Sequence, residues 1–231
     1  MKSTKSFSKT LLLAGDSRSP AAEAFRTLRT NIQFAGIDRP LKKIMVAGPV
    51  PGCGKTTTLV NLGLALAKTG SSVLLIDTDL RKPDLHKLFK FRNEQGLTSH
   101  LFDSELELDR IIYQSIFENV CILSSGPIPP NPSELIASAK FKEMVQTLSA
   151  SYDYLLFDTP PVNAATDPAI LSQLVDATIF VIRYGIDTRE EALYALDQLK
   201  KVDAHIIGAV MNALPSRNGA YYYYYEYGSK Q

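Results

Sequence analysis

Six short apolar segments, separated by longer helical segments, constrain the fold of this 231-residue chain more than any other feature. Each segment is a nearly continuous run of apolar residues, which is typical of strands that are buried on both faces. Helices between such strands imply a mainly parallel sheet that is covered on both sides, hence an α/β fold. The predicted strands cover residues 44–47, 72–77, 121–125, 154–158, 177–183 and 206–213.

The helical segments divide the chain into one large domain with two extensions. Residues 21–36 place Ala24, Phe25, Leu28 and Ile32 at helical spacing and predict a helix before the first strand. We therefore expect an N-terminal arm at 1–20, an α/β domain at 21–214 and a flexible tail at 215–231. The other predicted helices cover 55–69, 84–91, 104–114, 133–149, 167–174 and 188–201.

The overall composition argues against several function classes. The 25 lysines and arginines nearly balance the 24 aspartates and glutamates, so no global charge favours nucleic acid or an acidic membrane surface. Cys53 and Cys121 are too few for a disulfide framework and favour a reducing compartment. The sequence contains neither a secretory signal nor an apolar run of membrane-spanning length. We expect a soluble, cytoplasmic protein that does not bind nucleic acid.

A glycine-rich loop follows the first predicted strand, with the sequence PVPGCGKTTT at residues 49–58. It resembles a P-loop, in which glycines let backbone N–H groups turn toward phosphate oxygens at a helix start. Lys55 would bind the outer phosphates of ATP, and the Thr56 hydroxyl would bind Mg²⁺. The usual first glycine falls at Pro49, with Gly48 one residue earlier. The predicted nucleotide-binding residues are Gly52, Cys53, Gly54, Lys55, Thr56, Thr57 and Asn212.

Three carboxylates follow the ends of predicted strands near this loop. Asp77 and Asp79 come at the end of VLLIDTDLR, and Asp158 ends YLLFD. Carboxylates at the carboxyl ends of parallel strands converge on one edge of the sheet, where they can hold Mg²⁺ or accept a proton. Each residue taken singly has the alternative role of a turn former or helix cap. The predicted catalytic residues are these three aspartates and Lys55. The predicted metal ligands are the same three aspartates and Thr56.

Other polar residues near these motifs have two interpretations each. Arg81 pairs with a carboxylate or phosphate, or is an ordinary surface arginine. Asn212 hydrogen-bonds the nucleotide base or forms a turn. For Cys53, a small residue tolerated in a tight loop is favoured over a reactive thiol with a lowered pKa. His86, His100 and His205 lack metal-ligand spacing and are interpreted as structural or solvent-facing.

The motifs GPVPGCGKTT, LLIDTDLRKP and LLFDTPP, followed by a terminal tyrosine cluster, together resemble the bacterial tyrosine kinases of capsule and exopolysaccharide synthesis. In that family they are called Walker A, A′ and B, on a P-loop fold shared with partition ATPases. GPIPPNPSEL at 126–135 also resembles a family loop. The resemblance implies ATP, Mg²⁺ and autophosphorylation of the tail. The acceptors would be Tyr221, Tyr222, Tyr223, Tyr224, Tyr225 and Tyr227.

The same resemblance implies partners. Glu23, Arg26 and Arg29 match an oligomerisation motif, E-x-x-R-x-x-R, and imply a homo-oligomeric ring, although their spacing alone favours a solvated stripe with an intrahelical ion pair. Family membership further implies a transmembrane activator (a polysaccharide co-polymerase), a cognate tyrosine phosphatase and protein tyrosine substrates. The activator would hold the kinase at the inner face of the cell membrane.

Two alternative functions share parts of this pattern. Partition and division-site ATPases have the same Walker arrangement, but they carry an additional lysine at the position of Val50. A scaffold that binds nucleotide without catalysis is the other alternative. A partition ATPase would also need a basic DNA-binding surface or a terminal amphipathic membrane helix, and the tail, which holds six of the eleven tyrosines of the chain, is neither.

Overall fold

The computed structural model describes residue 11, residue 13 and residues 19–103 and 105–215. A sheet of seven strands runs through the centre of this part, in the order β3-β4-β2-β5-β1-β6-β7. All neighbouring strands are parallel except β3 and β4, which confirms the predicted fold class. The strands are β1 (Lys43–Ala47), β2 (Val73–Asp77), β3 (Ile112–Gln114), β4 (Val120–Leu123), β5 (Tyr154–Asp158), β6 (Ala177–Arg183) and β7 (Ile206–Asn212).

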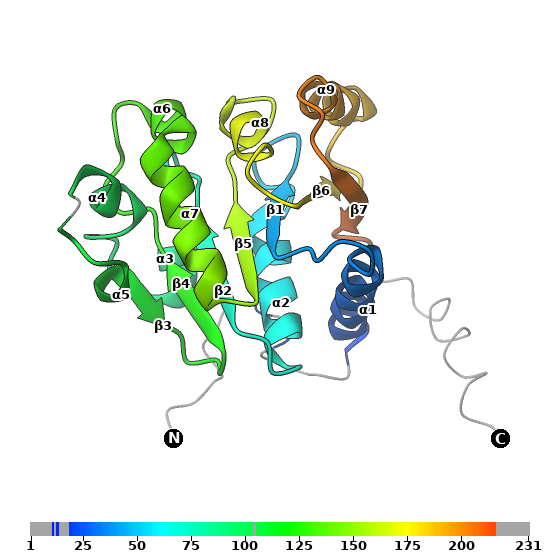
Figure 1. Ribbon diagram of the computed structural model, residues 1–231. Coiled ribbons are helices and arrows are strands. Elements are labelled where there is room, and N and C mark those ends of the chain that lie inside the picture. The colour runs from blue at the N-terminus through cyan, green and yellow to red at the C-terminus, as the bar shows by residue number, and fades with distance from the viewer. Residues whose placement is uncertain (1–10, 12, 14–18, 104, 216–231) are drawn as a thin grey trace.

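Helices cover both faces of the sheet (Figure 1). Three of them, α1, α2 and α3, contribute to the hydrophobic core on one face. Most of the others, including α7, α8 and α9, pack on the opposite face. The helices are α1 (Pro20–Ala35), α2 (Lys55–Ala67), α3 (Leu85–Phe89), α4 (Leu97–Phe102), α5 (Leu108–Ile111), α6 (Pro132–Ala137), α7 (Ala139–Ser151), α8 (Asp167–Leu171) and α9 (Arg189–Lys200).

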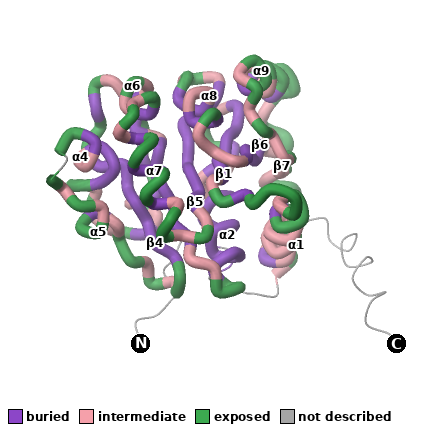
Figure 2. The backbone as a smooth tube through the Cα atoms, in the orientation of Figure 1, coloured by how far each residue is buried: buried purple, intermediate pink, exposed green. Residues whose placement is uncertain are grey.

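Alternation along the central strands divides the interior into two cores. In β1, Ile44 and Val46 face the core beneath α2, whereas Met45 and Ala47 face the core beneath α7. Successive side chains of a strand point to opposite faces, so a strand covered on both sides must be apolar throughout. Figure 2 shows that the central strands, like most of α2, are continuously buried. This arrangement holds the carboxyl ends of β1, β2 and β5 rigidly beside one another.

The prediction of a helix at 104–114 was wrong. Residues Leu108–Ile111 form a single helical turn, and Ile112–Gln114 form the antiparallel edge strand β3. β-Branched and aromatic residues favour a strand where a sheet edge is available. Tyr113 stacks on Phe91 with ring centroids 4.5 Å apart, a tertiary contact that periodicity alone does not reveal.

The predicted helix at 133–149 is two helices, α6 and α7. Ser138 is extended between them, and its Oγ accepts a hydrogen bond from the backbone N–H of Phe141. Serine favours such N-cap positions, because its hydroxyl satisfies an N–H that the helix leaves unpaired. Helix α4, which begins after Gly96, was not predicted from the sequence. A Cβ at Gly96 would lie 2.3 Å from the carbonyl oxygen of Ser124, so only glycine permits this close approach.

Two residues of the predicted N-terminal arm belong to the core. Leu11 and Leu13 are buried against the side of the sheet that α2 covers. The backbone N–H of Leu13 donates to Asn61 Oδ1 at 3.1 Å, and Lys68 Nζ donates to the Leu13 carbonyl at 3.2 Å. These two residues of the predicted arm at 1–20 therefore pack on the domain, and their apolar side chains contribute to its stability.

Candidate nucleotide-binding and active site

The glycine-rich loop joins β1 to α2 as predicted. Gly54 adopts a left-handed conformation with φ +107°, and α2 begins at the next residue. A Cβ at Gly54 would lie 1.8 Å from Asn212 Nδ2, and a Cβ at Gly48 would lie 2.5 Å from Cys53 Sγ. Both positions therefore require glycine for close approach, and Gly54 requires it also for its left-handed conformation. Gly48 fulfils a steric requirement of the loop although it lies one position before the usual first glycine.

The side chain of Asn212 connects the end of β7 to this loop. Its Nδ2 donates to the carbonyl of Cys53 at 3.0 Å, while its Oδ1 accepts from the N–H of Ala213 at 2.8 Å. Asn212 therefore fixes the loop and also forms a turn; base recognition stays a prediction. Arg183, which the sequence analysis missed, donates from Nη1 to the carbonyl of Gly52 at 3.4 Å. Arg183 is the last residue of β6, and this position at a strand end is the sequence feature from which it could have been predicted.

Lys55 and Thr56 occupy the first turn of α2. The ammonium of Lys55 is largely buried and lies 3.4 Å from the Val50 carbonyl oxygen. The Thr56 hydroxyl donates to Asp158 Oδ2 at 2.6 Å. The loop thus presents a cation, a hydroxyl and helix N-terminal N–H groups from one short segment, which is the chemistry that polyphosphate and Mg²⁺ require.

Two of the predicted carboxylates lie side by side beneath the loop. Asp77 and Asp158 are paired residues at the ends of β2 and β5, and both are buried. Asp77 Oδ2 accepts from the backbone N–H groups of Asp84 and Leu85 at 3.1 Å each. Asp77 Oδ1 and Asp158 Oδ1 have no hydrogen-bond partner within the described residues. Unpartnered buried carboxylate oxygens indicate a site that a cation or donor completes.

Burial changes the ionisation of this pair. Desolvation raises the pKa of Asp158 to about 7, although the Thr56 hydroxyl and the Lys55 charge partly oppose this. Desolvation, followed by repulsion from Asp158, raises the pKa of Asp77 well above its usual range. A bound divalent cation would reverse this effect, because it stabilises the ionised carboxylates.

Asp79 is placed differently from the other two. Its Oδ1 accepts from the backbone N–H groups of Arg81 and Lys82, at 3.2 and 2.9 Å, so it also forms the turn that the alternative interpretation described. It nevertheless lines the same pocket as Asp158 and Thr56. Across the described residues, no three His, Cys, Asp or Glu side chains form a metal cluster on their own. The donors fit Mg²⁺ held by Thr56, Asp158 and phosphate oxygens rather than by a protein-only cage.

Arg81 pairs with a carboxylate that the sequence analysis did not single out. Its Nε and Nη2 donate to the two oxygens of Asp167, at 3.0 and 3.1 Å. Asp167 is almost fully buried and also accepts from Ser133 Oγ. This forked ion pair joins the loop after β2 to α6 and α8. The carboxylate-pair interpretation is confirmed for Arg81, which lies at the surface, and Asp167 at a helix start after Thr166 was the available signal.

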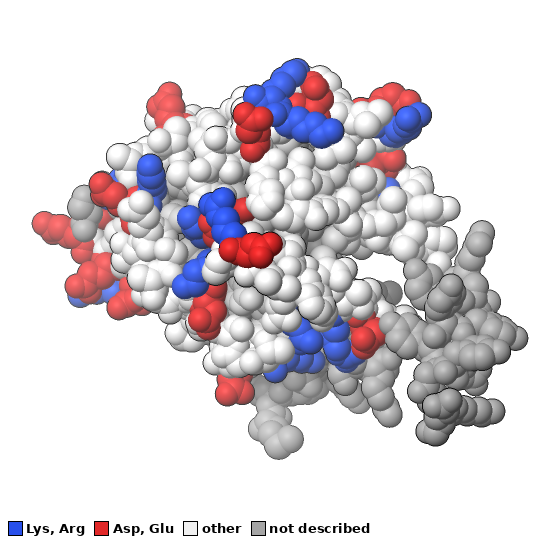
Figure 3. Space-filling view, turned by 45° about the vertical axis from the view of Figure 1, so that its right-hand side comes forward, with Lys and Arg blue, Asp and Glu red and all other residues white. Residues whose placement is uncertain are grey.

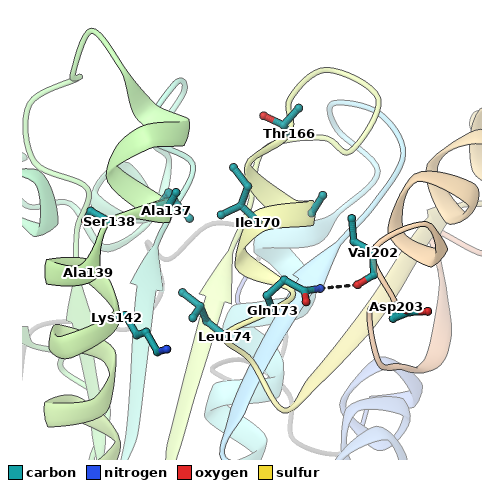
Figure 4. Close-up of a pocket in the computed structure, with 12 residues that line it drawn as sticks. Ala137, Ser138, Ala139, Lys142, Thr166, Ile170, Gln173, Leu174, Val202 and Asp203 are labelled. Carbon is teal, nitrogen blue, oxygen red and sulfur yellow. Dashed lines mark hydrogen bonds between the residues drawn. The ribbon is translucent and has the colours of Figure 1, made fainter.

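The chemical site is a pocket of about 550 Å³ between the loop and the segment after β2. It is lined by Lys55, Thr56, Asp79 and Asp158, and Asp77 lies behind its surface. A larger hollow of about 830 Å³ lies between the α6–α7 junction, α8 and the end of α9 (Figure 4). Its labelled side chains are a mixture of apolar and polar groups, and none belongs to the predicted site. Only the smaller pocket combines phosphate-binding and acidic groups.

The remaining predicted residues fall outside this pocket. Burial raises the pKa of the Cys53 thiol, so the alternative of a reactive thiol with lowered pKa is wrong. On α1, Arg26 forms an ion pair with Glu23, as the intrahelical alternative expected. Arg29 Nη1 donates to the Ala65 carbonyl at 3.2 Å and so ties α1 to α2. The six tail tyrosines lie outside the described residues.

The raised pKa of Asp158 predicts a pH-dependent stability of the metal-free protein. An unfolded aspartate titrates near pH 3.9, whereas Asp158 titrates near pH 7. Between these values the folded protein holds a proton that the unfolded chain has lost, so stability falls as pH rises. We expect the free energy of unfolding to decrease between pH 5 and pH 8 by at most roughly 3 kcal/mol from this group.

Urea unfolding at pH 5 and at pH 8 measures this difference in the free energy of unfolding. Asp158→Asn should lose a part of it, and Asp197→Asn should retain all of it, because Asp197 is exposed. An equal pH dependence in Asp158→Asn and the unaltered chain would contradict the assignment.

The fold and the geometry of the site first define the class of this protein. A phosphate-binding loop after β1, acidic residues at the ends of β2 and β5 and a mainly parallel sheet are the features of a P-loop ATPase fold. The AAA domain family matches residues 41–210. The septum site-determining protein MinD from Pyrococcus horikoshii, solved in complex with Mg-ADP, has a similar fold, with a TM-score of 0.63 and 25% identity over 77% of this chain and 72% of that one.

Two further similarities are more specific. Tyrosine-protein kinase YwqD of Bacillus subtilis (strain 168) is 41% identical over 208 residues, which are 90% of this chain and 87% of that protein. The crystal structure of the chimerical protein CapA2B2 superposes with a TM-score of 0.86 and 34% identity, over 90% of this chain and 92% of that one. The chain belongs to the bacterial tyrosine-protein kinase family, and its enzymatic class is ATP-dependent protein-tyrosine kinase.

Proposed function

We propose that this kinase autophosphorylates its C-terminal tyrosine cluster, Tyr221–Tyr225 and Tyr227, and thereby regulates capsule or exopolysaccharide synthesis and export. The observation that carries the proposal is the pocket of about 550 Å³ in which the phosphate loop, Lys55 and Asp158 meet. The tail supplies six acceptor hydroxyls within seven residues.

The reaction transfers one phosphoryl group. The phenolic oxygen of a tyrosine forms a bond to the γ-phosphorus of ATP, the bond from that phosphorus to the β,γ-bridging oxygen breaks, and ADP leaves. The phenolic proton passes to a carboxylate at the pocket surface. When bound, Mg²⁺ neutralises phosphate charge. Lys55 and the loop N–H groups hold the transferring group and stabilise its charge, so positioning and electrostatics supply most of the rate.

The carboxylates divide into two roles on this geometry. Asp158 and Asp79 line the pocket and are the candidates for contact with Mg²⁺ or the tyrosine hydroxyl. Asp77 lies behind the surface, where its Oδ2 holds the start of α3, and it affects Asp158 through charge. The forked pair of Arg81 with Asp167 fixes the turn that carries Asp79. Arg81 therefore acts as a positioning residue.

A membrane protein is the proposed activator. The described residues include no helix long and apolar enough to cross a membrane, and the chimera CapA2B2 superposes on this chain over most of its length. We propose that a transmembrane polysaccharide co-polymerase docks a cytoplasmic segment on the kinase and holds it at the inner membrane face. Substrate proteins and a cognate tyrosine phosphatase complete the proposed cycle.

Charges on α1 are proposed to connect subunits in a ring. If Arg26 contacts a neighbouring subunit as well as Glu23, Arg26→Glu should convert the ring to monomers, measured by light scattering. Arg110→Glu is the matched control, because Arg110 forms the same i, i+3 pair with Glu107 on the exposed surface. Loss of an intrahelical pair alone costs only about 0.2–0.5 kcal/mol. A ring that persists in Arg26→Glu would refute the role of Arg26.

Phosphorylation would work against this assembly. Each phosphate adds about 1.5–2 negative charges, so six modified tyrosines in every tail would repel one another in a ring. We propose that unmodified chains assemble and heavily modified chains separate. Phosphatase treatment should then restore the larger mass.

One assay tests the proposed function. The purified chain is incubated with ATP and Mg²⁺, with and without the cytoplasmic segment of its candidate activator, and phosphotyrosine is measured by immunoblot. The proposal expects phosphotyrosine that increases when the activator segment is added. ATP hydrolysis without phosphotyrosine would favour the partition-type ATPase, and nucleotide binding without turnover would favour the scaffold.

A further inference from the structure

The active-site pocket has an outer wall that the nucleotide chemistry leaves unexplained. One side of the pocket is the phosphate loop and the first turn of α2, and Asp158 and Asp79 supply its acidic groups. The opposite side comes from the segment between β2 and the end of α3, and we call it the outer wall. It consists of Lys82, Asp84, Lys87, Leu88 and Lys90.

The charge of the outer wall is positive. Three lysines against one aspartate leave two net positive charges, and all four of these side chains are exposed. Lys87 pairs with Asp84 at 2.7 Å. Within the described part of the chain, Lys82 has no ion pair, and its backbone N–H is fixed by Asp79. The wall therefore offers positive charge to whatever enters the pocket from solvent.

This charge is segregated from the charge that binds phosphate. Lys55 and the helix N-terminus already face the phosphate side, and Lys55 is buried whereas Lys82 and Lys90 are exposed. Elsewhere on the molecule charges are mixed: Figure 3 shows basic and acidic side chains interspersed on the face turned toward α1 and α9. The net positive charge of the outer wall, which remains after Lys87 pairs with Asp84, fits recognition of an anionic ligand.

An apolar contact lies within the same wall. Leu88 is half-buried between the exposed lysines and lines the pocket. An aromatic ring gains free energy by covering such a side chain, while its hydroxyl reaches a polar site beyond it. Positive charge around one apolar residue therefore suits a tyrosine with acidic neighbours.

We propose that the outer wall is the acceptor subsite, and that Lys82 and Lys90 select tyrosines flanked by negative charge, with the C-terminal tail as the occupant. This inference rests on the proposed kinase function and names its substrate class. Glu226 supplies one negative charge within the cluster, and each phosphate added to a neighbouring tyrosine supplies more. Early phosphates strengthen the binding of the remaining tyrosines, so phosphorylation of the cluster is self-reinforcing.

The tail has enough length to reach such a subsite. The described chain ends at Pro215, three residues after Asn212, whose side chain holds the phosphate loop. Tyr221 follows six residues later, which span about 20 Å when extended. This reach includes the pocket of the same subunit and, in an assembly, that of a neighbour.

The test measures peptide binding and peptide phosphorylation separately. A chain in which all six tail tyrosines are phenylalanine serves as the enzyme, so that its own tail does not compete as a substrate. The probes are fluorescent peptides of residues 221–231, either unmodified or with phosphotyrosine at Tyr225 and Tyr227. Fluorescence anisotropy in Mg-ADP gives the Kd of each peptide, and initial rates give KM and kcat for the unmodified one.

The variant is Lys82→Glu with Lys90→Glu. We expect the Kd of the phosphorylated peptide to rise about tenfold and the acceptor KM to rise, with kcat changed less than about twofold. Lys200→Glu with Lys201→Glu, the same charge reversal at the end of α9, should leave both constants unchanged. With the wall unaltered, the phosphorylated peptide should bind more tightly than the unmodified peptide.

Three results would overturn parts of this account, and they are distinguishable. Equal affinity for the two peptides on the unaltered wall would overturn the inference. An equal loss of Mg-ADP affinity in the Lys82 and Lys90 variant would assign these lysines to the nucleotide and also overturn it. Absence of peptide phosphorylation, with or without the activator segment, would instead overturn the proposed function.

Discussion

Lys55→Met should lower the rate of tyrosine phosphorylation by about 100- to 1000-fold. Lys55 is a buried cation in the phosphate loop, and its ammonium contacts only the Val50 carbonyl and Cys53 Sγ among the described residues. Methionine has a similar length and no charge, so the substitution removes the electrostatic contribution with little change in packing. Radiolabelled phosphate transfer from ATP measures the loss.

Lys68→Met is the matched control for this prediction. Lys68 ends the same helix, and its ammonium bonds the Leu13 carbonyl on the far side from the pocket. Its phosphorylation rate should stay within about twofold of the unaltered chain, because no phosphate approaches it. A Lys55→Met chain that is folded, judged by circular dichroism, and still phosphorylates tyrosine at the normal rate would remove Lys55 from the site.

Asp158→Asn should produce a loss of similar size, about 100- to 10,000-fold in kcat. Asparagine retains an oxygen that accepts from the Thr56 hydroxyl, so the 2.6 Å hydrogen bond can persist. The substitution removes the negative charge that Mg²⁺ and the phenolic proton require. The affinity for Mg-ADP should fall as well, which isothermal titration calorimetry measures.

Asp153→Asn provides the comparison, because Asp153 lies directly before the opposite end of β5 and bonds Ser72 at the surface. Its activity and Mg-ADP affinity should equal those of the unaltered chain. If Asp158→Asn keeps full activity while Asp77→Asn or Asp79→Asn loses it, the role assigned to Asp158 belongs to that other carboxylate.

The sequence predicted the parts of this fold that depend on local patterns. Continuous apolar strands such as Val73–Asp77 are recognisable because burial on both faces leaves no polar alternation. The glycine-rich loop is recognisable because Gly54 and Lys55 stand next to each other at a helix start, where together they bind phosphate. The convergence of Asp77 and Asp158 followed from the rule that parallel strands present their carboxyl ends at one edge.

The parts that the sequence did not predict depend on distant contacts. β3 forms because a sheet edge and Phe91 are available to Ile112–Gln114. The ion pair between Arg81 and Asp167 joins residues that are 86 positions apart, so the local sequence around either residue does not predict it. The burial of Leu11 and Leu13 likewise depends on α2, which lies more than 40 positions later. Local propensity carries no information about such partners.

Mapping of phosphotyrosine by mass spectrometry tests the central claim most directly. The purified chain is incubated with Mg-ATP and its activator segment, beside a chain whose six tail tyrosines are phenylalanine. The account predicts phosphate on Tyr221–Tyr225 and Tyr227 in the first chain, and Mg-ATP binding without tail phosphate in the second. Phosphotyrosine confined to residues 1–215 in the unaltered chain would contradict it.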